Sequence, residues 1–145
     1  ELHGDKIAFV DGSEEAVDSI VFATGYQITF PFFEPEFLTV SGNDISLYRK
    51  VVSPEHEGLY FIGLIQPLGA IMPLAELQAK WVAGLLKGTH RLPHKQTMVA
   101  EIAKARAKIE QRYVKSARHT IQVDFYPYKR LMEGELAAGQ QAVGV

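Results

Sequence analysis

The sequence predicts an α/β fold built from short strands and two amphipathic helices. The run Leu59–Ile62 is aromatic and β-branched and lies between Gly58 and Gly63, as is typical of a buried strand. A proline-led segment, Pro73–Lys87, follows this run and repeats apolar residues with helical spacing. Another helical period begins near Thr97. Strands and helices in this arrangement favour a mixed α/β architecture.

Composition limits the classes of function. The chain has 145 residues, about one domain by size. Fifteen Lys+Arg against 17 Asp+Glu give a net charge of −2, so we expect no nucleic-acid partner. There is no cysteine, which excludes disulfides, thiolate metal sites and a redox-active cysteine pair. No apolar run reaches the length of a membrane span and no signal peptide is visible. The first residue is Glu1, in what resembles the middle of a hairpin, so we expect a piece of a longer protein.

The first quarter of the sequence predicts a hairpin and then a buried strand. Lys6–Val10 alternates and meets the turn residues Asp11–Ser13. Ile20–Ala23 is a nearly continuous apolar run, as expected of a parallel strand covered on both faces. Thr24 and Gly25 end this strand. In isolation they indicate a strand end with a tight turn, although Gly25 would also leave room for a ligand.

Two more segments precede the central strand. Phe30–Leu38 is aromatic and broken by prolines, so it cannot form a regular helix or a central strand. We expect an irregular loop packed on the core, with a substrate-facing role as the less favoured alternative. Ser46–Val52 is predicted to form a second strand, and Ser53–Gly58 a polar turn leading back into Leu59–Ile62.

The turn after the central strand has the features of a cofactor-facing loop. Gly63 allows a ligand to approach the backbone closely. Pro73 suits the first position of a helix, whose N-terminus presents free N–H groups and partial positive charge. Gln66 is the one side chain in the turn with both a donor and an acceptor on an amide. In α/β proteins, ligands bind beyond the carboxyl ends of strands, where this loop would lie.

Both helices are predicted to bury one face. The first should end near Lys87, with Gly88 as the stop, and the second should carry charged residues on its solvated side. After Met132 the tail loses apolar periodicity. The apolar positions are Leu74, Leu77, Trp81 and Leu85 in the first helix and Met98, Ile102, Ala105, Ile109 and Tyr113 in the second.

Several kinds of site are not indicated. The five histidines are scattered without metal-binding spacing, so no metal site is predicted. There is no nucleophile elbow or Ser-His-Asp pattern. No G-x-G-x-x-G and no P-loop occur, so the chain does not carry a pyrophosphate-binding turn.

Motifs along nearly the whole chain resemble those of the flavin-containing monooxygenases, most closely the animal members. The first resembles D-x-I-x-x-A-T-G-Y, and its Ala-Thr-Gly is shared by many flavoproteins. The more specific match is to I-G-L-x-Q-P-L-G…P-x-x-E-L-Q-x-R-W. The matched segments are Asp18–Tyr26, Phe30–Phe32, Leu47–Lys50, Ile62–Gly69, Pro73, Glu76–Trp81, Leu92–Pro93, Met98, Arg112–Val114, Arg118–Gln122 and Asp124.

The resemblance implies the C-terminal part of a flavoprotein with two dinucleotide-binding domains, which binds FAD and NADPH. Residues 1–57 would end the NADP domain and cross over, 58–121 would hold the last FAD-domain strand and the helices, and 122–145 would form a tail. In this family a flavin C4a-hydroperoxide formed with O2 oxygenates soft nitrogen or sulfur atoms of small amines and sulfides. The chain would supply one wall of the flavin site, with the rest of the same polypeptide as its partner, and would be inactive alone.

The resemblance also assigns residues to the flavin. Gln66 matches the family glutamine that hydrogen-bonds the flavin. Gly69 lies in the same turn, near the isoalloxazine, and Gly63 would allow the backbone to approach.

Three further residues are assigned to the cofactors on weaker grounds. Thr24 and Gly25 mark the crossing back from the NADPH domain to the FAD domain and either contact cofactor or serve only as structure. Lys129 lies in a segment, Tyr128–Met132, that resembles one which brings a cation to NADP in bacterial members. Association with the endoplasmic reticulum membrane is implied, with a cytoplasmic location as the alternative. The apolar anchor that ends many animal members is not visible here.

Two other functions stay open at this point. One is another flavoprotein with two dinucleotide domains, such as a disulfide reductase, which typically follows its last flavin strand with Gly-Asp, whereas Leu64 follows Gly63 here. The other is a non-catalytic binding module that folds and acts alone.

Overall fold

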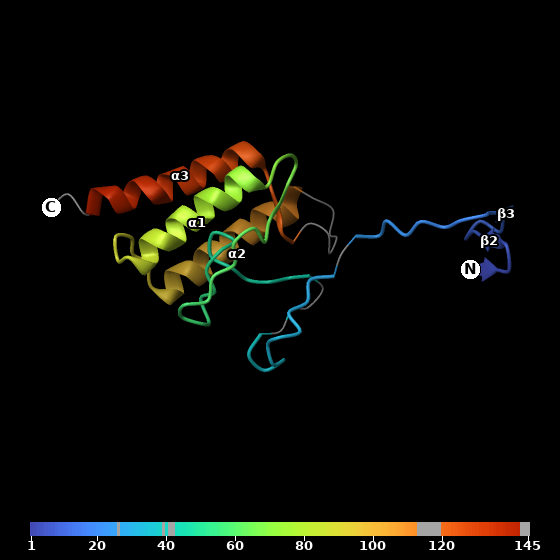
Figure 1. Ribbon diagram of the computed structural model, residues 1–145, viewed down its shortest axis with the longest axis horizontal. Helices are drawn as coiled ribbons and strands as arrows, with labels where there is room; N and C mark the ends of the chain where they lie inside the picture. The colour runs from blue at the N-terminus through green and yellow to red at the C-terminus, as the bar shows by residue number, and fades with distance from the viewer. Residues whose placement is uncertain (26, 39, 41–42, 113–119, 143–145) are drawn as a thin grey trace.

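The computed structural model describes residues 1–25, 27–38, 40, 43–112 and 120–142. It has short strands and three helices in the described part, so the mixed α/β class is confirmed, with one helix more than predicted. Figure 1 shows the helices gathered in one body and the N-terminal strands at the far end of an extended segment. The elements are β1 (Leu2–His3), β2 (Lys6–Ala8), β3 (Glu14–Ala16), β4 (Gln66–Pro67), α1 (Met72–Leu86), α2 (Lys95–Arg112), β5 (Gln122–Val123) and α3 (Phe125–Ala142).

The N-terminal strands form the predicted hairpin with one strand added. β1, β2 and β3 make an antiparallel sheet in that order, and Ile7 of β2 faces Glu15 of β3. The turn is closed by Asp11, whose carboxylate accepts hydrogen bonds from the Ser13 N–H at 3.0 Å and from its hydroxyl at 2.7 Å. An aspartate that bonds the backbone two residues on is a common turn device.

The strand predicted at Ile20–Ala23 is wrong. The segment is extended but unpaired in the described chain, and its side chains are largely exposed, with Val21 at 88% and Phe22 at 76%. A strand forms only where another strand accepts its backbone hydrogen bonds. No strand in the described part of the chain pairs with this segment. Its apolar composition is therefore not matched by a covering surface within this chain.

The strand predicted at Ser46–Val52 is replaced by a tight turn. Arg49 and Lys50 both have left-handed backbone conformations, with φ of 53° and 58°. The Tyr48 N–H donates to the Val52 carbonyl at 2.8 Å. Two consecutive left-handed residues reverse the chain, as in a type I′ turn, so the expected run of extended backbone is interrupted.

The central strand was also placed wrongly. At Leu59–Ile62 only Tyr60 forms a single antiparallel bridge, to Val52, and Gly63 then bends the chain with φ 81°. The strand that precedes α1 is β4, because its partner β5 is available there and the Gln66 N–H donates to the Ile121 carbonyl at 2.9 Å.

Helix α1 confirms the sequence interpretation closely. It runs from Met72 with a proline in its first turn and ends at the cap residue Lys87, and Gly88 follows at φ 74°. Leu74 and Trp81 are almost fully buried, at 0% and 1% exposure. Leu77 and Leu85 pack against them.

Helix α2 begins slightly earlier than predicted and buries the expected face only in part. Its first residue is Lys95. Met98 is buried and Ile102 packs on the core, whereas Ala105 is exposed. Tyr113 and the side chain of Ile109 lie outside the described residues.

Helix α3 was not predicted. Tyr128 and Met132 bury against α1, and Leu136 packs beside them, which is helical spacing. Asp124 precedes the first turn and Pro127 lies inside it, both of which are helix-start features. The segment from Gln122, expected to be a tail that loses apolar periodicity after Met132, therefore contains a strand and a helix.

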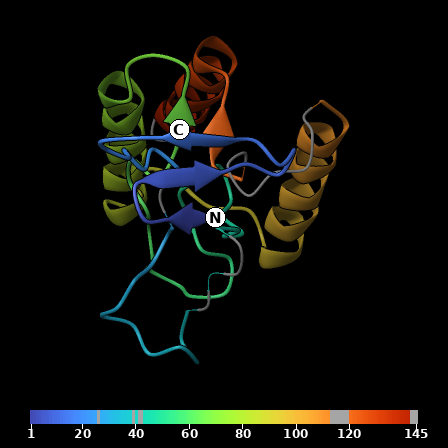
Figure 2. The same ribbon diagram turned by 90° about the vertical axis from the view of Figure 1, so that its right-hand side faces the viewer.

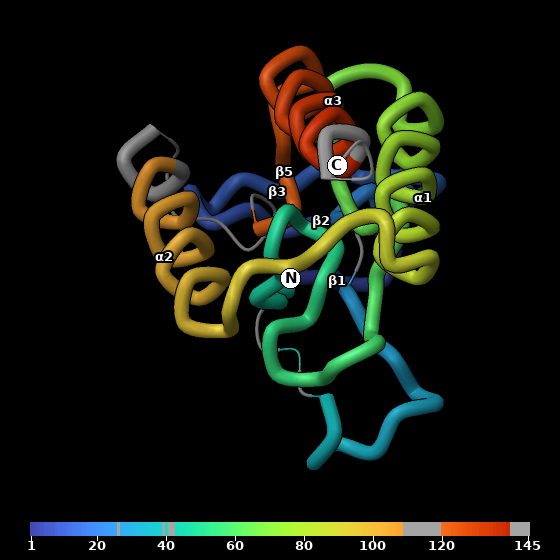
Figure 3. Tube along the Cα trace, turned by 90° about the vertical axis from the view of Figure 1, so that its left-hand side faces the viewer, coloured from blue at the N-terminus to red at the C-terminus, as the bar shows by residue number. Residues whose placement is uncertain are grey.

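One main core joins the three helices. Figure 3 shows α1 and α2 on opposite sides, α3 beside α1, and the chain near residues 45–60 between them. This agrees with the contacts, in which the tight turn packs against all three helices. The buried members are Tyr48, Val51, Val52, Ile65, Leu74, Trp81, Val82, Met98, Tyr128 and Met132.

Candidate functional site

Two parallel strands, each leading into a helix, organise the candidate site. β4 and β5 pair in parallel, with Gln66 opposite Gln122 and Pro67 opposite Val123. Figure 2 shows the two arrows side by side, with α1 and α3 following beyond the same edge. The carboxyl ends of parallel strands, where helix N-termini meet, are the usual location of ligands in α/β proteins. We therefore take this edge as the candidate site.

The segment between β4 and α1 presents several ligand-binding features. The Gln66 side chain is exposed, and Gly69 has φ 121° with no atom within 4 Å of where a Cβ would stand. The cap residue Ile71 makes no side-chain capping bond, and no acidic residue lies in the first turn of α1. Leu68 and Met72 are 80% and 72% exposed. An amide, bare backbone and apolar side chains together suit a flat ligand with polar edges.

A buried hydrogen-bond chain fixes the start of this segment. The Gly63 N–H donates to Gln78 Oε1 at 2.7 Å, and Gln78 Nε2 donates to the Tyr128 hydroxyl at 2.6 Å. That hydroxyl donates to the Arg49 carbonyl at 2.6 Å. Burial raises the pKa of Tyr128 to about 12, so the hydroxyl keeps the proton it donates. The Gly63 N–H is thus used within the protein and is not a donor for a ligand.

The tight turn is held from both sides by charged groups. Arg49 Nη1 and Nε lie 2.7 Å from Glu101 of α2 and 2.7 Å from Glu135 of α3. Lys50 Nζ donates to the Thr120 carbonyl, just before β5, at 2.8 Å. Burial lowers the pKa of Lys50, since desolvation disfavours the ammonium ion. The turn therefore connects α2, α3 and the start of β5.

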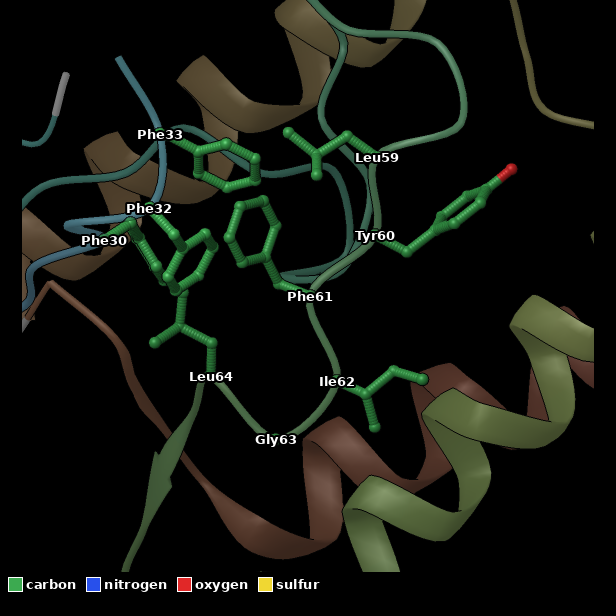
Figure 4. Close-up of a pocket in the computed structure, with 9 residues that line it drawn as sticks. All are labelled: Phe30, Phe32, Phe33, Leu59, Tyr60, Phe61, Ile62, Gly63 and Leu64. Atoms are coloured by element: carbon green, nitrogen blue, oxygen red, sulfur yellow. The ribbon is translucent and has the colours of Figure 1, made fainter. Parts of the chain in front are cut away.

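A separate apolar cavity lies beside the same stretch of chain. Its volume is ≈ 370 Å³. Figure 4 shows the phenylalanine rings gathered around it, while the Tyr60 hydroxyl points away and Ile62 points toward the helices. No charged side chain is among its lining residues, and the cavity offers a mainly apolar surface. Its lining residues are Phe30, Phe32, Phe33, Leu59, Tyr60, Phe61, Ile62, Gly63 and Leu64.

The aromatic segment 30–38 was correctly predicted to be irregular, but it is packed only in part, because Phe30 and Leu38 pack on buried residues whereas Phe32 is 75% exposed. The rings of Phe30 and Phe61 have centroids 5.2 Å apart. Phe61 belongs with Ile45 and Leu47 to a second, smaller buried cluster. This cluster forms one wall of the cavity.

Comparison with known proteins identifies the family. A family model described as flavin-binding monooxygenase-like matches residues 1–139. The chain belongs to the flavin-binding monooxygenase-like family.

The relatives of this family member are much longer than the chain. It is 52% identical over 120 residues to flavin-containing monooxygenase 5 of Homo sapiens, covering 81% of this chain and 22% of that protein. It is 43% identical over 141 residues to dimethylaniline monooxygenase [N-oxide-forming] 2 of Rattus norvegicus, covering 95% and 26%. The solved structure of S-allyl-L-cysteine S-oxygenase from Allium sativum aligns with a TM-score of 0.76 at 30% identity, covering 92% of this chain and 31% of that one. The chain thus spans about a quarter of the length of these curated relatives.

The structure brings together only some of the residues expected to bind cofactor in this family member. Gly63, Gln66 and Gly69 lie in one continuous stretch that leads into α1. Thr24 and Gly25 are exposed and lie in the extended segment that joins the N-terminal sheet to the helices. The first three therefore share one segment of the described chain, and the other two lie outside that segment.

Lys129 lies on a helix outside this stretch, and three residues that support the site were not predicted. Lys129 is on α3, where its ammonium lies 3.5 Å from Glu133. The sequence interpretation missed Gln78, Tyr128 and Arg49. Gln78 could have been noticed, because it is a polar residue at a position that the apolar period of α1 assigns to the buried face. Arg49 offered no comparable signal, since its partners are distant in sequence.

Neither a metal-binding cluster nor a membrane-spanning helix is found among the residues that the structure describes. In the described ranges, no group of three or more His, Asp or Glu side chains is placed to hold a metal ion. None of the helices in the part of the chain that the structure describes is both long and apolar enough to cross a membrane.

Proposed function

We propose that this chain is the C-terminal part of an FAD- and NADPH-dependent monooxygenase, and that it forms one wall of the flavin site. The observation that carries the proposal is the exposed residue Gln66, which begins β4 in the segment that leads to the N-terminus of α1, where no side chain caps the helix. The full-length polypeptide would provide the phosphate-binding loops that this sequence does not contain. FAD, when bound, would supply the oxygen-activating chemistry.

The residues around Gln66 fit a flavin ring. The Gln66 amide can both donate to and accept from the polar edge of the ring. Gly69 has open space beside its backbone, so the ring can lie close to the chain. The N-terminus of α1 favours negative charge in front of it. Leu68 and Met72 would cover the apolar face of the ring and exclude water, which protects reactive flavin states.

The substrate class follows from the relatives. One relative forms N-oxides and another is an S-oxygenase. We propose that the full-length protein, like these relatives, oxygenates soft nitrogen or sulfur atoms of small amines or sulfides, using O2 and NADPH. Association with the endoplasmic reticulum membrane remains a prediction from the resemblance and can be checked by cell fractionation.

The domain division and the N-terminal residues belong to the same proposal. Residues 1–57 would end the NADP domain, and Thr24 and Gly25 would mark the crossing into the FAD domain. The exposed run Ile20–Ala23 would be covered by the rest of the polypeptide. Exposed apolar surface of this kind is typical of an interface.

The role of Gln66 is tested in the full-length protein with Gln66→Ala. We expect weaker FAD retention on gel filtration and more hydrogen peroxide released per NADPH consumed, because one polar contact to the ring is lost. Gln96→Ala, at an exposed glutamine of α2, is the matched control and should behave as wild type. Equal retention and coupling in both variants would contradict the assignment of Gln66. A full-length protein without bound flavin would instead favour the non-catalytic module.

A further inference from the structure

We propose that Gln78 is a positioning residue for the flavin site, acting through its hydrogen bond to the Gly63 N–H. This inference rests on the proposed function and goes beyond it, because Gln78 itself is fully buried, at 0% exposure, and cannot touch the cofactor. Its effect would be to hold the segment 63–69 in the position that presents Gln66 to the ring.

The hydrogen bonds of Gln78 leave its amide one orientation. Oε1 accepts from the Gly63 backbone, and Nε2 donates to the hydroxyl of Tyr128. Since Tyr128 donates its own proton to the Arg49 carbonyl, it can only accept from Gln78. The direction of every bond in the chain is therefore determined, and turning the amide over would place two donors together.

The bond to Gly63 acts at a point where the backbone needs support. Gly63 has φ 81°, a conformation that glycine adopts freely and that no local sequence preference enforces. Three residues later the chain forms β4, which pairs with β5 over two residues only. A short strand fixes its own position weakly, so an anchor at Gly63 determines where Gln66 lies.

The other end of the chain is anchored to the helical body. Tyr128 lies at the start of α3, and Arg49 bonds Glu101 of α2 and Glu135 of α3. The Gly63 backbone is thus tied through α1 to both other helices. Packing alone would be satisfied by an apolar side chain at position 78, because Leu74 and Trp81 on the same face are apolar. The hydrogen bonds of the Gln78 amide fix its own orientation and hold the Gly63 backbone in one position.

The experiment uses the full-length protein with Gln78→Leu, which keeps the side-chain bulk and removes both hydrogen bonds. We expect the Kd for FAD to rise about tenfold, because a Gly63 backbone that Gln78 no longer holds would present Gln66 less well to the ring, at a cost comparable to one hydrogen bond to the ring. Hydrogen peroxide release per NADPH should also increase. Met132→Ala is the control for a merely structural role, because Met132 is fully buried in the same core. It should lower the melting temperature but leave FAD affinity and coupling unchanged when measured well below unfolding.

A conservative variant gives a second readout and covers the case in which Gln78→Leu does not fold. A protonated glutamic acid has one donor and one acceptor, as the glutamine amide requires here, whereas its carboxylate has no donor for Tyr128. We therefore expect Gln78→Glu to bind FAD nearly as wild type at low pH and progressively more weakly as the pH rises, relative to wild type.

The outcomes separate this inference from the proposed function. Wild-type affinity and coupling in Gln78→Leu, or a Gln78→Glu variant that follows wild type at every pH, would overturn the positioning role and leave the flavin assignment intact. Equal uncoupling by Met132→Ala would also overturn it, because the effect would then be one of general stability. A wild-type protein that binds no FAD would overturn both.

Discussion

The helical body buries a large apolar core, whereas the N-terminal arm leaves its apolar run exposed. In the helical body, residues 43–112 and 120–142, the large apolar side chains of three helices and a turn converge on one core, with Leu74 and Met132 at 0% exposure. In the arm, residues 1–25, Val21 and Phe22 are 88% and 76% exposed. The arm has a comparable apolar run but no surface in the described chain to cover it. The comparison indicates that the described body supplies its own core, whereas the apolar run of the arm is not buried by the described residues.

The largest effect on the free energy of unfolding is expected in the helical body. Trp81→Ala should lower the free energy of unfolding by about 3–5 kcal/mol, because it removes an almost fully buried ring and leaves a cavity. Urea unfolding of the full-length protein measures this change. A loss below about 1 kcal/mol would mean that the core around α1 is not packed as described.

The next effect comes from pH acting on the buried hydrogen-bond chain. The pKa of Tyr128 is raised from 10.0 to about 12, so the unfolded state loses this proton first. The stability that this group contributes is complete below pH 10 and is lost as the pH rises toward about 12, on the order of 2–3 kcal/mol.

Comparing two tyrosine variants isolates that contribution. Tyr128→Phe should flatten the alkaline decrease in unfolding free energy, although it also removes hydrogen bonds at neutral pH. Tyr126→Phe, at a residue 72% exposed, should retain the wild-type profile. Identical alkaline profiles for the two variants would exclude Tyr128 as the source.

Replacing either of two helical glycines of the body by alanine should change the free energy of unfolding, in opposite directions. At Gly84 of α1, an added Cβ would collide with the ring of His90, whereas at Gly134 of α3 nothing lies within 4 Å. Gly84→Ala should therefore destabilise by about 1–3 kcal/mol through overpacking. Gly134→Ala should stabilise by about 0.5–1 kcal/mol, because alanine restricts the unfolded chain and favours the helix. Thermal unfolding of both variants tests this contrast, and effects of the same sign would refute it.

The smallest effect on the free energy of unfolding is expected in the N-terminal arm. In the isolated 145-residue chain, Phe22→Ala should change the free energy of unfolding by less than about 0.5 kcal/mol, because the ring is already in water. In the full-length protein the same change should cost clearly more, since the arm would then be covered. Equal effects in both settings would remove the distinction between arm and body.

The sequence predicted the elements whose partners are local. The N-terminal hairpin and α1, with Pro73 in its first turn and Gly88 after its end, are set by turn chemistry and by one apolar period. The strands at Ile20–Ala23 and Ser46–Val52 were wrong because strand formation depends on a partner that a sequence pattern does not specify. Helix α3 was overlooked although Tyr128, Met132 and Leu136 show its period.

The same distinction between local and distant partners applies to the candidate site. The stretch from Gly63 to Gly69 could be found because glycines, an amide and a helix start occur together in sequence. The support for this stretch could be found only in part. Gln78 stands out as a polar residue on the buried face of α1, whereas its connection to Tyr128 and Arg49 exists only through the fold.

Flavin content tests the central claim most directly. The full-length protein and the isolated 145-residue chain would be purified in the presence of FAD, and their visible absorbance compared. We predict an equimolar amount of FAD in the full-length protein and none in the isolated chain, because under this account the chain would form only one wall of the site and its sequence contains no phosphate-binding loop. A colourless full-length protein, or an isolated chain that holds FAD by itself, would contradict the account.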